Sequence, residues 1–146
     1  MENTLPTLDM VLLVDDDDTT NYLNRRLLKE MNVAKEIVVL KNGKEALEFV
    51  ERACGANAEN NTNCPDLIFL DIKMPIMDGF SFLEEYKKRG LDNTDHVIIM
   101  MLTSSASFYD LEKLKSYTKV KKHYSKALTK HDVQEVMREF FSHRKK

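Results

Sequence analysis

The sequence predicts an α/β protein built on one parallel β-sheet with helices on both faces. Two observations support this: apolar runs alternate strictly with helical patterns along the chain, and each kind occurs five times. Strand–helix alternation produces parallel strands joined by right-handed crossovers, and covering both faces requires helices on both sides. The common order for five such strands is 2-1-3-4-5, the doubly wound, flavodoxin-like arrangement, which we expect here.

The individual elements follow from apolar periodicity and its interruptions. Short apolar runs bounded by turn residues indicate strands buried on both faces, and amphipathic stretches between them indicate helices. The expected strands are Met10–Val14, Glu36–Leu40, Asp66–Leu70, Val97–Leu102 and Val120–Tyr124, and the expected helices are Thr19–Met31, Gly43–Cys54, Gly79–Arg89, Ser107–Ser116 and Lys130–Phe141.

Helical spacing also predicts which side chains of the first and last helices enter the core. Asp18 or Thr19 can act as the N-cap of the first helix, and Asp78 can cap the third. The expected core side chains are Tyr22, Leu23, Leu27 and Met31 in the first helix and Val133, Val136, Met137 and Phe140 in the last.

Length and charge limit the class of protein. The 146 residues predict one domain, 1–146, with a core over about 9–142, loose termini and no output domain. The balance of 22 basic and 24 acidic residues argues against a nucleic-acid-binding module. No apolar stretch approaches the roughly 18 residues of a membrane span, and the N-terminus lacks a secretory pattern. We therefore expect a cytoplasmic protein that binds neither membranes nor nucleic acid.

The two cysteines, Cys54 and Cys64, flank the polar segment Gly55–Asn63. A disulfide closing this loop is conceivable, but in a chain without a signal peptide we expect two reduced thiols. The surrounding stretch Gly55–Pro65 indicates a surface excursion whose role the sequence leaves open.

Acidic residues follow two of the expected strands. Asp71 comes directly after an apolar run, and because a carboxylate in mid-strand is costly to desolvate, we expect it at the strand's C-terminal end. The first strand is followed by Asp15 and Asp16, and the order 2-1-3-4-5 places these two strand ends side by side. Carboxylates gathered in this way repel one another unless a cation joins them. The pattern therefore predicts a Mg²⁺ site around Asp71.

A hydroxyl and an ammonium follow the other two neighbouring strands. Thr103 ends the fourth strand and Lys126 follows the fifth, so both are expected beside Asp71. A carboxylate that accepts a phosphoryl group needs a metal, a hydroxyl or backbone N–H groups, and an ammonium to balance the phosphoryl oxygens. Each residue alone also fits a structural role, since acids are common at helix N-termini. Their joint position at four strand ends favours the phosphate-accepting site.

Four motifs carry a resemblance to a known family. They are Leu12-Leu13-Val14-Asp15-Asp16, the stretch from Leu70 to Gly79, Leu102-Thr103-Ser104 and Tyr124-Ser125-Lys126. Over about residues 9–142 the chain resembles a response-regulator receiver domain of two-component signalling, and it is similar in extent to the chemotaxis response regulator.

The resemblance implies roles for the acidic residues. Asp71 would accept phosphate from a phosphohistidine of a sensor histidine kinase or a histidine phosphotransfer protein. Asp16 would bind Mg²⁺ directly, Asp15 partly through water, and the backbone carbonyl of Lys73 would complete the protein's ligands. Lys73 and Ser105 occupy positions that modulate the lifetime of the acyl phosphate in the family.

The resemblance also implies a switching apparatus. Thr103 would hydrogen-bond the phosphoryl group and shift toward it, assisted by the backbone N–H of Ser104, and Lys126 would pair with another phosphoryl oxygen. His123 stands where the family usually has an aromatic switch residue. It is either such a switch, sensitive to pH near neutrality, or a partly exposed strand histidine.

The residue after Lys126 departs from the family pattern, because Ala127 replaces the usual proline with its cis bond. A cis bond before a non-proline residue costs about 2.5–4 kcal/mol, so we expect a trans Lys126–Ala127 bond with an altered loop, or else a strained cis bond.

Several functions remain open at this point. The main expectation is a single-domain switch, not an enzyme, that acts on a downstream protein in trans, as a monomer or a phosphorylation-dependent dimer. A phosphate shuttle and an unphosphorylated pseudo-receiver are alternatives. An aspartate-nucleophile phosphohydrolase is disfavoured because its second acid would fall at Lys73. The stretch Leu111–Lys130 has seven Lys and one Glu, which indicates a solvated face or a docking surface for an acidic partner.

Overall fold

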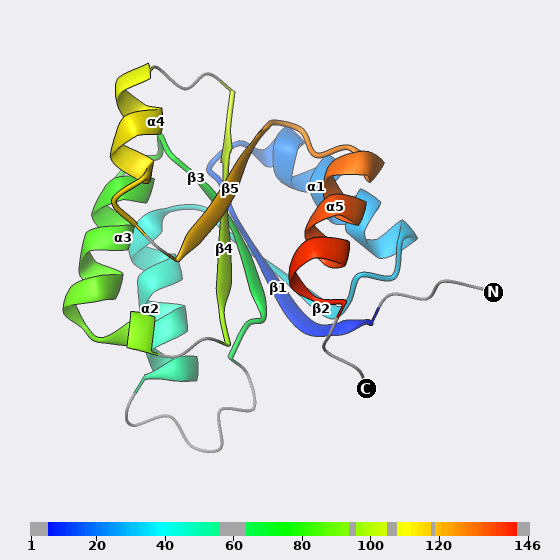
Figure 1. The fold of residues 1–146 in the computed structure, drawn as a ribbon, viewed down its shortest axis with the longest axis horizontal. Coiled ribbons are helices and arrows are strands. Elements are labelled where there is room, and N and C mark those ends of the chain that lie inside the picture. Colours follow the sequence, from blue (N-terminus) through cyan, green and yellow to red (C-terminus); the bar gives the residue numbers. More distant parts are fainter. Residues whose placement is uncertain (1–5, 56–63, 94–95, 105–107, 118, 143–146) are drawn as a thin grey trace.

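The computed structural model describes residues 6–55, 64–93, 96–104, 108–117 and 119–142, and it forms the expected sheet. The strands are parallel and lie in the order β2-β1-β3-β4-β5, which confirms the predicted fold (Figure 1). The strands are β1 (Leu8–Val14), β2 (Ala34–Leu40), β3 (Leu67–Asp71), β4 (Ile98–Thr103) and β5 (Val120–Ser125). The helices are α1 (Asp18–Glu30), α2 (Gly43–Cys54), α3 (Gly79–Lys88), the short 3-10 helix η1 (Leu91–Asn93), α4 (Phe108–Leu114) and α5 (Lys130–Phe140).

The sheet separates two hydrophobic cores, one under each layer of helices. Helices α1 and α5 cover one face, and α2, α3 and α4 cover the other (Figure 1). Successive residues of β1 alternate between the two cores: Val11 and Leu13 pack with α1 and α5, whereas Leu12 and Val14 pack with α2 and α3. This alternation explains why β1, β3 and β4 are almost continuously apolar, since both sides of each strand are buried.

Helix α1 meets the expectation for its core side chains only in part. Leu27 and Met31 pack against the core, whereas Tyr22 and Leu23, also expected there, are 64% and 45% exposed. The buried residues of α1 are Thr20, Asn21, Asn24 and Leu28. The reason is hydrogen bonding, because buried polar groups on this face pair with backbone atoms of neighbouring loops. The expectation for α5 holds better, with Val133, Val136 and Met137 buried and Phe140 packed against the same core.

The helix caps agree with expectation at α3 and differ at α1. The Asp78 carboxylate accepts a hydrogen bond from the Ser81 N–H at 2.8 Å, as predicted. The N-cap of α1 is Asp17, one residue before the expected positions, and its carboxylate accepts a hydrogen bond from the Thr20 hydroxyl. Helix α5 begins with a capping box between Thr129 and Asp132.

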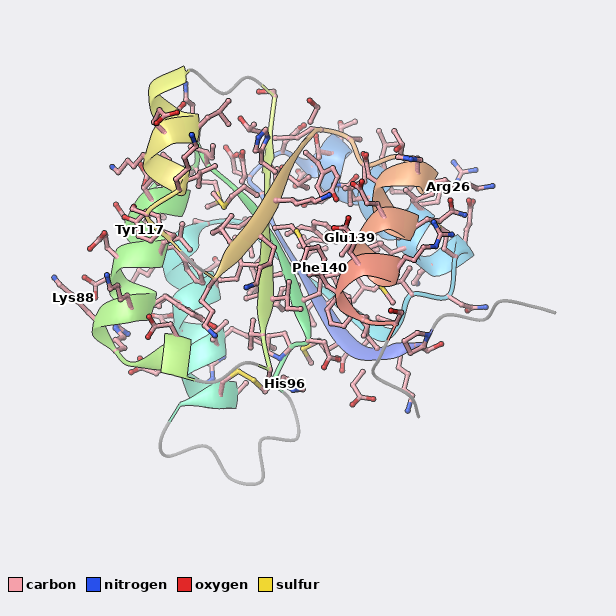
Figure 2. The ribbon with its side chains drawn as sticks, in the orientation of Figure 1. Arg26, Lys88, His96, Tyr117, Glu139 and Phe140 are labelled. Atoms are coloured by element: carbon pink, nitrogen blue, oxygen red, sulfur yellow. A yellow bond between two sulfur atoms is a disulfide. The ribbon has the colours of Figure 1, made fainter. Side chains whose placement is uncertain are left out.

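The cysteines form a disulfide, so the expectation of two reduced thiols is wrong. Cys54 ends α2 and Cys64 lies just before β3, and their Cα atoms are 5.0 Å apart. Figure 2 shows the bond at the end of α2, near His96. The spacing alone could not show that α2 returns the chain to the start of β3. Most of the expected excursion Gly55–Pro65 (56–63), and most of both expected loose termini (1–5 and 143–146), lie outside the described residues.

None of the helices in the described ranges combines the length and apolar character needed to cross a bilayer.

Candidate functional site

Three carboxylates meet where β1 and β3 end. Asp71 is the last residue of β3, and Asp15 directly follows β1, whose Val14 is paired with Leu70. Asp15 and Asp71 are 2% and 3% exposed, while Asp16 is exposed to solvent. One oxygen from each of the three lies within 4.8 Å of the others. The predicted cluster therefore forms, with two of its members buried.

Lys126 supplies a positive charge to this cluster. Its Nζ lies 3.2 Å from Asp71 Oδ2 and 3.1 Å from Asp15 Oδ1, and donates a hydrogen bond to each. The Lys126 side chain is only 13% exposed. Its backbone N–H donates to the carbonyl oxygen of Thr103 at 3.2 Å, which ties the end of β5 to the end of β4. The ammonium is thus held in the position that the sequence predicts.

The peptide bond between Lys126 and Ala127 is cis. Of the two alternatives expected, the trans bond is therefore wrong and the cis bond is the one observed, and the ammonium of Lys126 reaches both acids. The next residue, Leu128, is held by the side chain of Asn24, which accepts a hydrogen bond from the Leu128 N–H at 2.9 Å.

Burial and charge shift the ionisation of Asp71. Burial has the largest effect and the nearby Asp15 carboxylate adds to it, so the pKa of Asp71 rises to about 6. The Lys126 ammonium and a hydrogen bond from the Lys73 backbone N–H act in the opposite direction. Burial lowers the pKa of Lys126, but its hydrogen bonds and ion pairs with Asp15 and Asp71 outweigh this and raise it. At neutral pH Asp71 is therefore an ionised carboxylate in a site that disfavours the charge.

The buried oxygens leave coordination capacity for a cation. Asp15 Oδ2 lies 3.0 Å from the ammonium of Lys126, yet no donor among the described residues has the geometry of a hydrogen bond to it. An acceptor that is buried without a hydrogen bond is unfavourable unless another partner satisfies it. Carboxylate oxygens in this arrangement suit Mg²⁺, which takes one or two carboxylates and keeps several waters. The residues present fit a small divalent cation.

The start of α1 holds Asp15 in place through two hydrogen bonds that the sequence did not predict. The Asp17 N–H donates to Asp15 Oδ1 at 2.9 Å, and Asn21 Nδ2 donates to the Asp15 carbonyl oxygen at 2.8 Å. The spacing of Asn21, Asn24 and Leu28 marks one helix face and could have revealed it. The more hydrophobic Tyr22 and Leu23 obscured that signal.

The loop after Asp71 is packed closely against α3. Gly79 begins α3, and its N–H donates to the Ile72 carbonyl oxygen at 2.8 Å. A Cβ atom on Gly79 would lie 2.6 Å from the Asp71 carbonyl oxygen, so only glycine allows this approach. Within the loop, Ile76 has a φ of 69° and is 78% exposed, which is a strained conformation for a β-branched residue.

The remaining predicted residues at the strand ends differ in their exposure to solvent. Thr103 ends β4, is 7% exposed, and follows Leu102, the partner of Asp71 in the sheet. Ser104 comes next and is exposed, Lys73 is exposed two residues beyond Asp71, and Ser105 lies outside the described residues.

His123 is exposed on β5, opposite Met101, and is not among the groups gathered around Asp71. It lines a groove of about 340 Å³ with Leu111, Leu114 and Val120.

Comparisons with known proteins agree with this arrangement. A family model described as the response regulator receiver domain matches residues 11–138. The chain is 34% identical over 83 residues to the sensor histidine kinase CheAY of Helicobacter pylori, covering 57% of this chain and 9% of that protein. It is 28% identical over 96 residues to the response regulator Rcp1 of Synechocystis, covering 66% of this chain and 62% of that protein.

A solved structure also matches the fold over most of its length. The crystal structure of a two component response regulator from Cytophaga hutchinsonii is 27% identical and superposes with a TM-score of 0.77, covering 90% of this chain and 95% of the other. Of the two curated relatives above, by contrast, the chain spans less than two thirds of either length.

Proposed function

Because the chain belongs to the response regulator receiver domain family, we propose that it is a phosphorylation-controlled switch whose Asp71 accepts a phosphoryl group from a phosphohistidine. The observation that carries the proposal is the ammonium of Lys126, which is bonded to both buried acids, Asp15 and Asp71. A structural ion pair would need one carboxylate, whereas Lys126 pairs with two, and a third carboxylate, that of Asp16, lies close to both of them. The excess negative charge is what a metal-assisted phosphoryl acceptor requires.

The transfer step uses the Asp71 carboxylate as nucleophile. One of its oxygens forms a bond to phosphorus while the bond from phosphorus to the donor's imidazole nitrogen breaks, and the imidazole leaves with the electron pair. With a pKa of about 6, Asp71 is ionised at neutral pH and ready to attack. Lys126 offsets part of the charge that the incoming phosphoryl group brings toward Asp15 and Asp71.

The cation that the acidic cluster fits is Mg²⁺. Asp15, Asp16 and Asp71 would hold it, together with the backbone carbonyl of Lys73. When bound, it neutralises phosphoryl oxygens and so lowers the repulsion between the carboxylates and the donor. Asp15 Oδ2, which accepts no hydrogen bond from the part of the chain that the structure describes, supports this assignment.

Thr103, Ser104 and Lys126 then hold the product. The Thr103 hydroxyl would donate to one phosphoryl oxygen, the Ser104 backbone N–H would assist, and the Lys126 ammonium would pair with another. The burial of Thr103 at the end of β4, beside the strand that carries Asp71, supports its role. A movement of Thr103 toward the phosphoryl group would pass to the β4–α4 side of the domain.

The output is proposed to be a change in protein contacts in trans. The phosphoryl donor would be a sensor histidine kinase or a histidine phosphotransfer protein. The protein whose binding changes would be a separate downstream protein. His123 would report the state of Thr103 to the groove between α4 and β5. The substitution His123→Phe should change the difference in partner affinity between the phosphorylated and unphosphorylated protein, because it alters the side chain that would report the state of Thr103. An unchanged difference in this variant would contradict a switching role for His123.

Intact-mass analysis after incubation with acetyl phosphate and Mg²⁺ tests the transfer itself. Wild type should gain one phosphoryl group, and EDTA should prevent this. Asp71→Asn should gain none, and Asp16→Asn should gain much less, since it loses a cation ligand. The matched control is Asp18→Asn, an exposed acid in the same run, which should be modified like wild type. The proposal would be overturned if Asp71→Asn gained a phosphoryl group. It would also be overturned if neither the wild type nor Asp18→Asn gained one.

A further inference from the structure

The loop that connects β3 to α3 carries Lys73, whose backbone carbonyl would be one of the cation's ligands. Two backbone hydrogen bonds fix the ends of this loop. The Ile72 carbonyl oxygen accepts one from the Gly79 N–H at 2.8 Å, and the Met77 carbonyl oxygen accepts the other from the Gly43 N–H at 3.0 Å. Gly43 is the first residue of α2, so one end of the loop is held by a different helix from the one that follows it.

The loop contains a strained turn between these two hydrogen bonds. The Met77 N–H donates to the Pro75 carbonyl oxygen at 2.7 Å, which closes a three-residue turn around Ile76 with its positive φ of 69°. Turns of this kind are rare, and such a φ persists only where the surrounding structure fixes it. The exposed side chain of Ile76 is not buried in the core, so the constraint comes from the backbone. The bond from Gly43 to Met77, the next residue, supplies it.

The start of α2 approaches the loop more closely than any residue with a side chain would allow. A Cβ atom on Gly43 would lie 2.4 Å from the Met77 carbonyl oxygen and 2.9 Å from Met77 Cγ. Non-bonded heavy atoms are most favourably placed at about 3.5–4.0 Å, so a larger residue at this position would push the loop and α2 apart by about 1 Å. The same displacement would lengthen the hydrogen bond from the residue's N–H to Met77.

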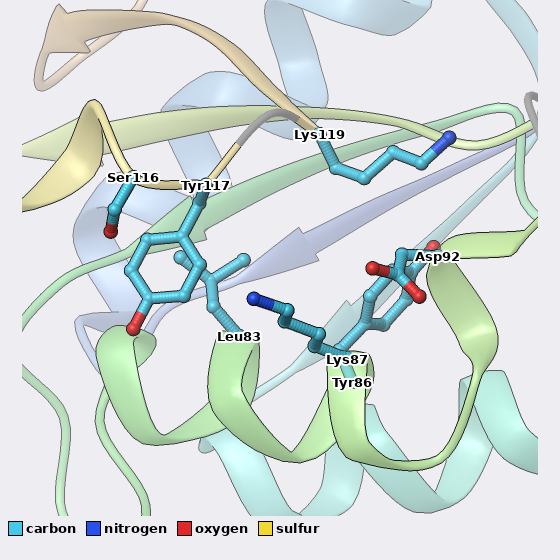
Figure 3. Close-up of a pocket in the computed structure, with 7 residues that line it drawn as sticks. All are labelled: Leu83, Tyr86, Lys87, Asp92, Ser116, Tyr117 and Lys119. Carbon is cyan, nitrogen blue, oxygen red and sulfur yellow. The ribbon is translucent and has the colours of Figure 1, made fainter.

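The two helices beside the loop are also held by contacts away from it. The Tyr117 hydroxyl donates to Glu84 of α3, and Figure 3 shows the Tyr117 side chain reaching α3 from the connection between α4 and β5. Arg89 follows α3, and its Nη1 lies 2.6 Å from Glu51 Oε1, which joins this end of α3 to α2. A displacement at Gly43 would therefore be taken up mainly by the loop.

We propose that Gly43 is a positioning residue for the cation site, an inference that rests on the proposed function. Its N–H holds Met77 and its missing Cβ admits α2 to the loop, and together they fix the turn at Ile76 and the backbone at Lys73. Mg²⁺ requires near-ideal octahedral geometry, so a small displacement of a ligand carbonyl weakens its binding. Groups that only orient metal ligands change metal affinity by about 10–100-fold when they are mutated. Helix α2 therefore tunes cation affinity through a residue that is not itself a ligand.

Mg²⁺ titrations followed by two-dimensional ¹⁵N NMR test this role in Gly43→Ala. In EDTA, before Mg²⁺ is added, the variant should shift the backbone signals of residues 71–78 relative to wild type. Its affinity for Mg²⁺ should be about tenfold lower. The matched control is Gly55→Ala at the other end of α2, where a Cβ would also lie 2.4 Å from a backbone oxygen, that of Glu51. The control should be less stable in urea but should keep the wild-type signals of 71–78 and the wild-type Mg²⁺ affinity.

A second variant, Asn42→Ala, tests the same role if Gly43→Ala does not fold. Asn42 is the N-cap of α2, and its Oδ1 accepts a hydrogen bond from the Glu45 N–H at 2.9 Å. Its removal loosens the turn that contains Gly43 without adding an atom near the loop. The Mg²⁺ affinity of this variant should be about twofold to fivefold lower than that of wild type.

Three outcomes overturn the inference. The first is a wild-type Mg²⁺ affinity in whichever of Gly43→Ala and Asn42→Ala folds. The second is a loss of affinity in Gly55→Ala equal to that in Gly43→Ala, since the effect would then follow from stability alone. The third is a wild type that binds no Mg²⁺. Only this third outcome would also overturn the proposed cation site, so the two failures can be told apart.

Discussion

Asn24 and Leu128 are joined by a buried hydrogen bond across 104 residues of sequence, in which the Leu128 N–H donates to Asn24 Oδ1 at 2.9 Å. Leu128 lies two residues after Lys126, so this bond links α1 to the segment that carries the site's ammonium. A second asparagine on the same helix face, Asn21, holds the backbone of Asp15. The buried face of α1 therefore positions both ends of the Lys126–Asp15 ion pair.

Removing the Asn24 side chain should disturb this arrangement. Asn24→Ala leaves the buried Leu128 N–H without a partner, and we expect the free energy of unfolding to fall by about 2 kcal/mol. Phosphorylation by acetyl phosphate should also slow, because Lys126 is less well held. Urea unfolding and intact-mass time courses measure the two effects. Tyr22→Ala, at a 64% exposed position on the same helix, should change stability by less than about 0.5 kcal/mol. Equal effects of the two substitutions would contradict this account.

The raised pKa of Asp71 predicts a pH-dependent cost to stability. Its pKa is about 6 in the folded protein against 3.8 for the unperturbed group, so folding favours the neutral form. The contribution of protonated Asp71 to the free energy of unfolding is therefore fully present below about pH 4. It is lost as the pH rises through 6, where the folded protein must ionise this buried carboxyl. Without Mg²⁺, Asp71→Asn should therefore be more stable than wild type by about 2 kcal/mol at neutral pH and about equal to it near pH 4.

Urea unfolding at a series of pH values in EDTA measures this difference. A stability gap that does not depend on pH would show that the substitution acts through something other than the charge on Asp71. Adding Mg²⁺ should narrow the gap by stabilising the wild type, since a ligand that binds only the folded state adds to its stability.

The role of Lys126 can be tested through the ionisation of its partner. Its ammonium lowers the pKa of Asp71, so Lys126→Gln should raise that pKa above 6. A carboxyl ¹³C NMR titration in the absence of Mg²⁺ reports the change. Lys122→Gln is the matched control, because Lys122 forms its ion pairs with Glu135 and Glu139 on α5. If Lys126→Gln left the pKa of Asp71 unchanged, this result would argue against a direct ion pair between the two side chains in solution.

The disulfide should affect stability but not phosphate acceptance. Reducing a bond that closes a loop with a sequence separation of 10 should lower the free energy of unfolding by about 2–3 kcal/mol. Cys64 precedes the start of β3 and Asp71 ends that strand, so the phosphorylation rate should be the same with and without dithiothreitol. The double variant Cys54→Ala, Cys64→Ala should show no response to dithiothreitol in unfolding experiments. A reductant that changes the phosphorylation rate of wild type would show that the two ends of β3 are coupled.

The fold and the acidic cluster were predictable because they depend on a simple geometric rule. The carboxyl ends of parallel strands lie on one side of a sheet, so the order 2-1-3-4-5 places Asp15 beside Asp71. It also brings Lys126, two strands away from β3, to the same side, from where its side chain reaches both acids. The rule needs only the location of the apolar runs, and errors of one or two residues at their ends do not alter it.

The features that the sequence did not predict depend on contacts between distant segments. The buried face of α1 is polar because Asn21 and Asn24 pair with backbone groups far away in the chain, which hydrophobic spacing cannot detect. The disulfide needs the end of α2 to lie beside the start of β3.

The long sequence separation within the site has a consequence for the newly made protein. Lys126 contacts Asp71 across 55 residues and Asp15 across 111. At the usual 5–20 residues per second, a ribosome needs about 3–11 s to travel from the codon for Asp71 to that for Lys126. During that interval the Asp71 carboxylate exists without its ammonium. A nascent chain should thus be unable to accept a phosphoryl group in the proposed way until Lys126 has been synthesised, and phosphate uptake can serve as an assay for folding of this part of the chain.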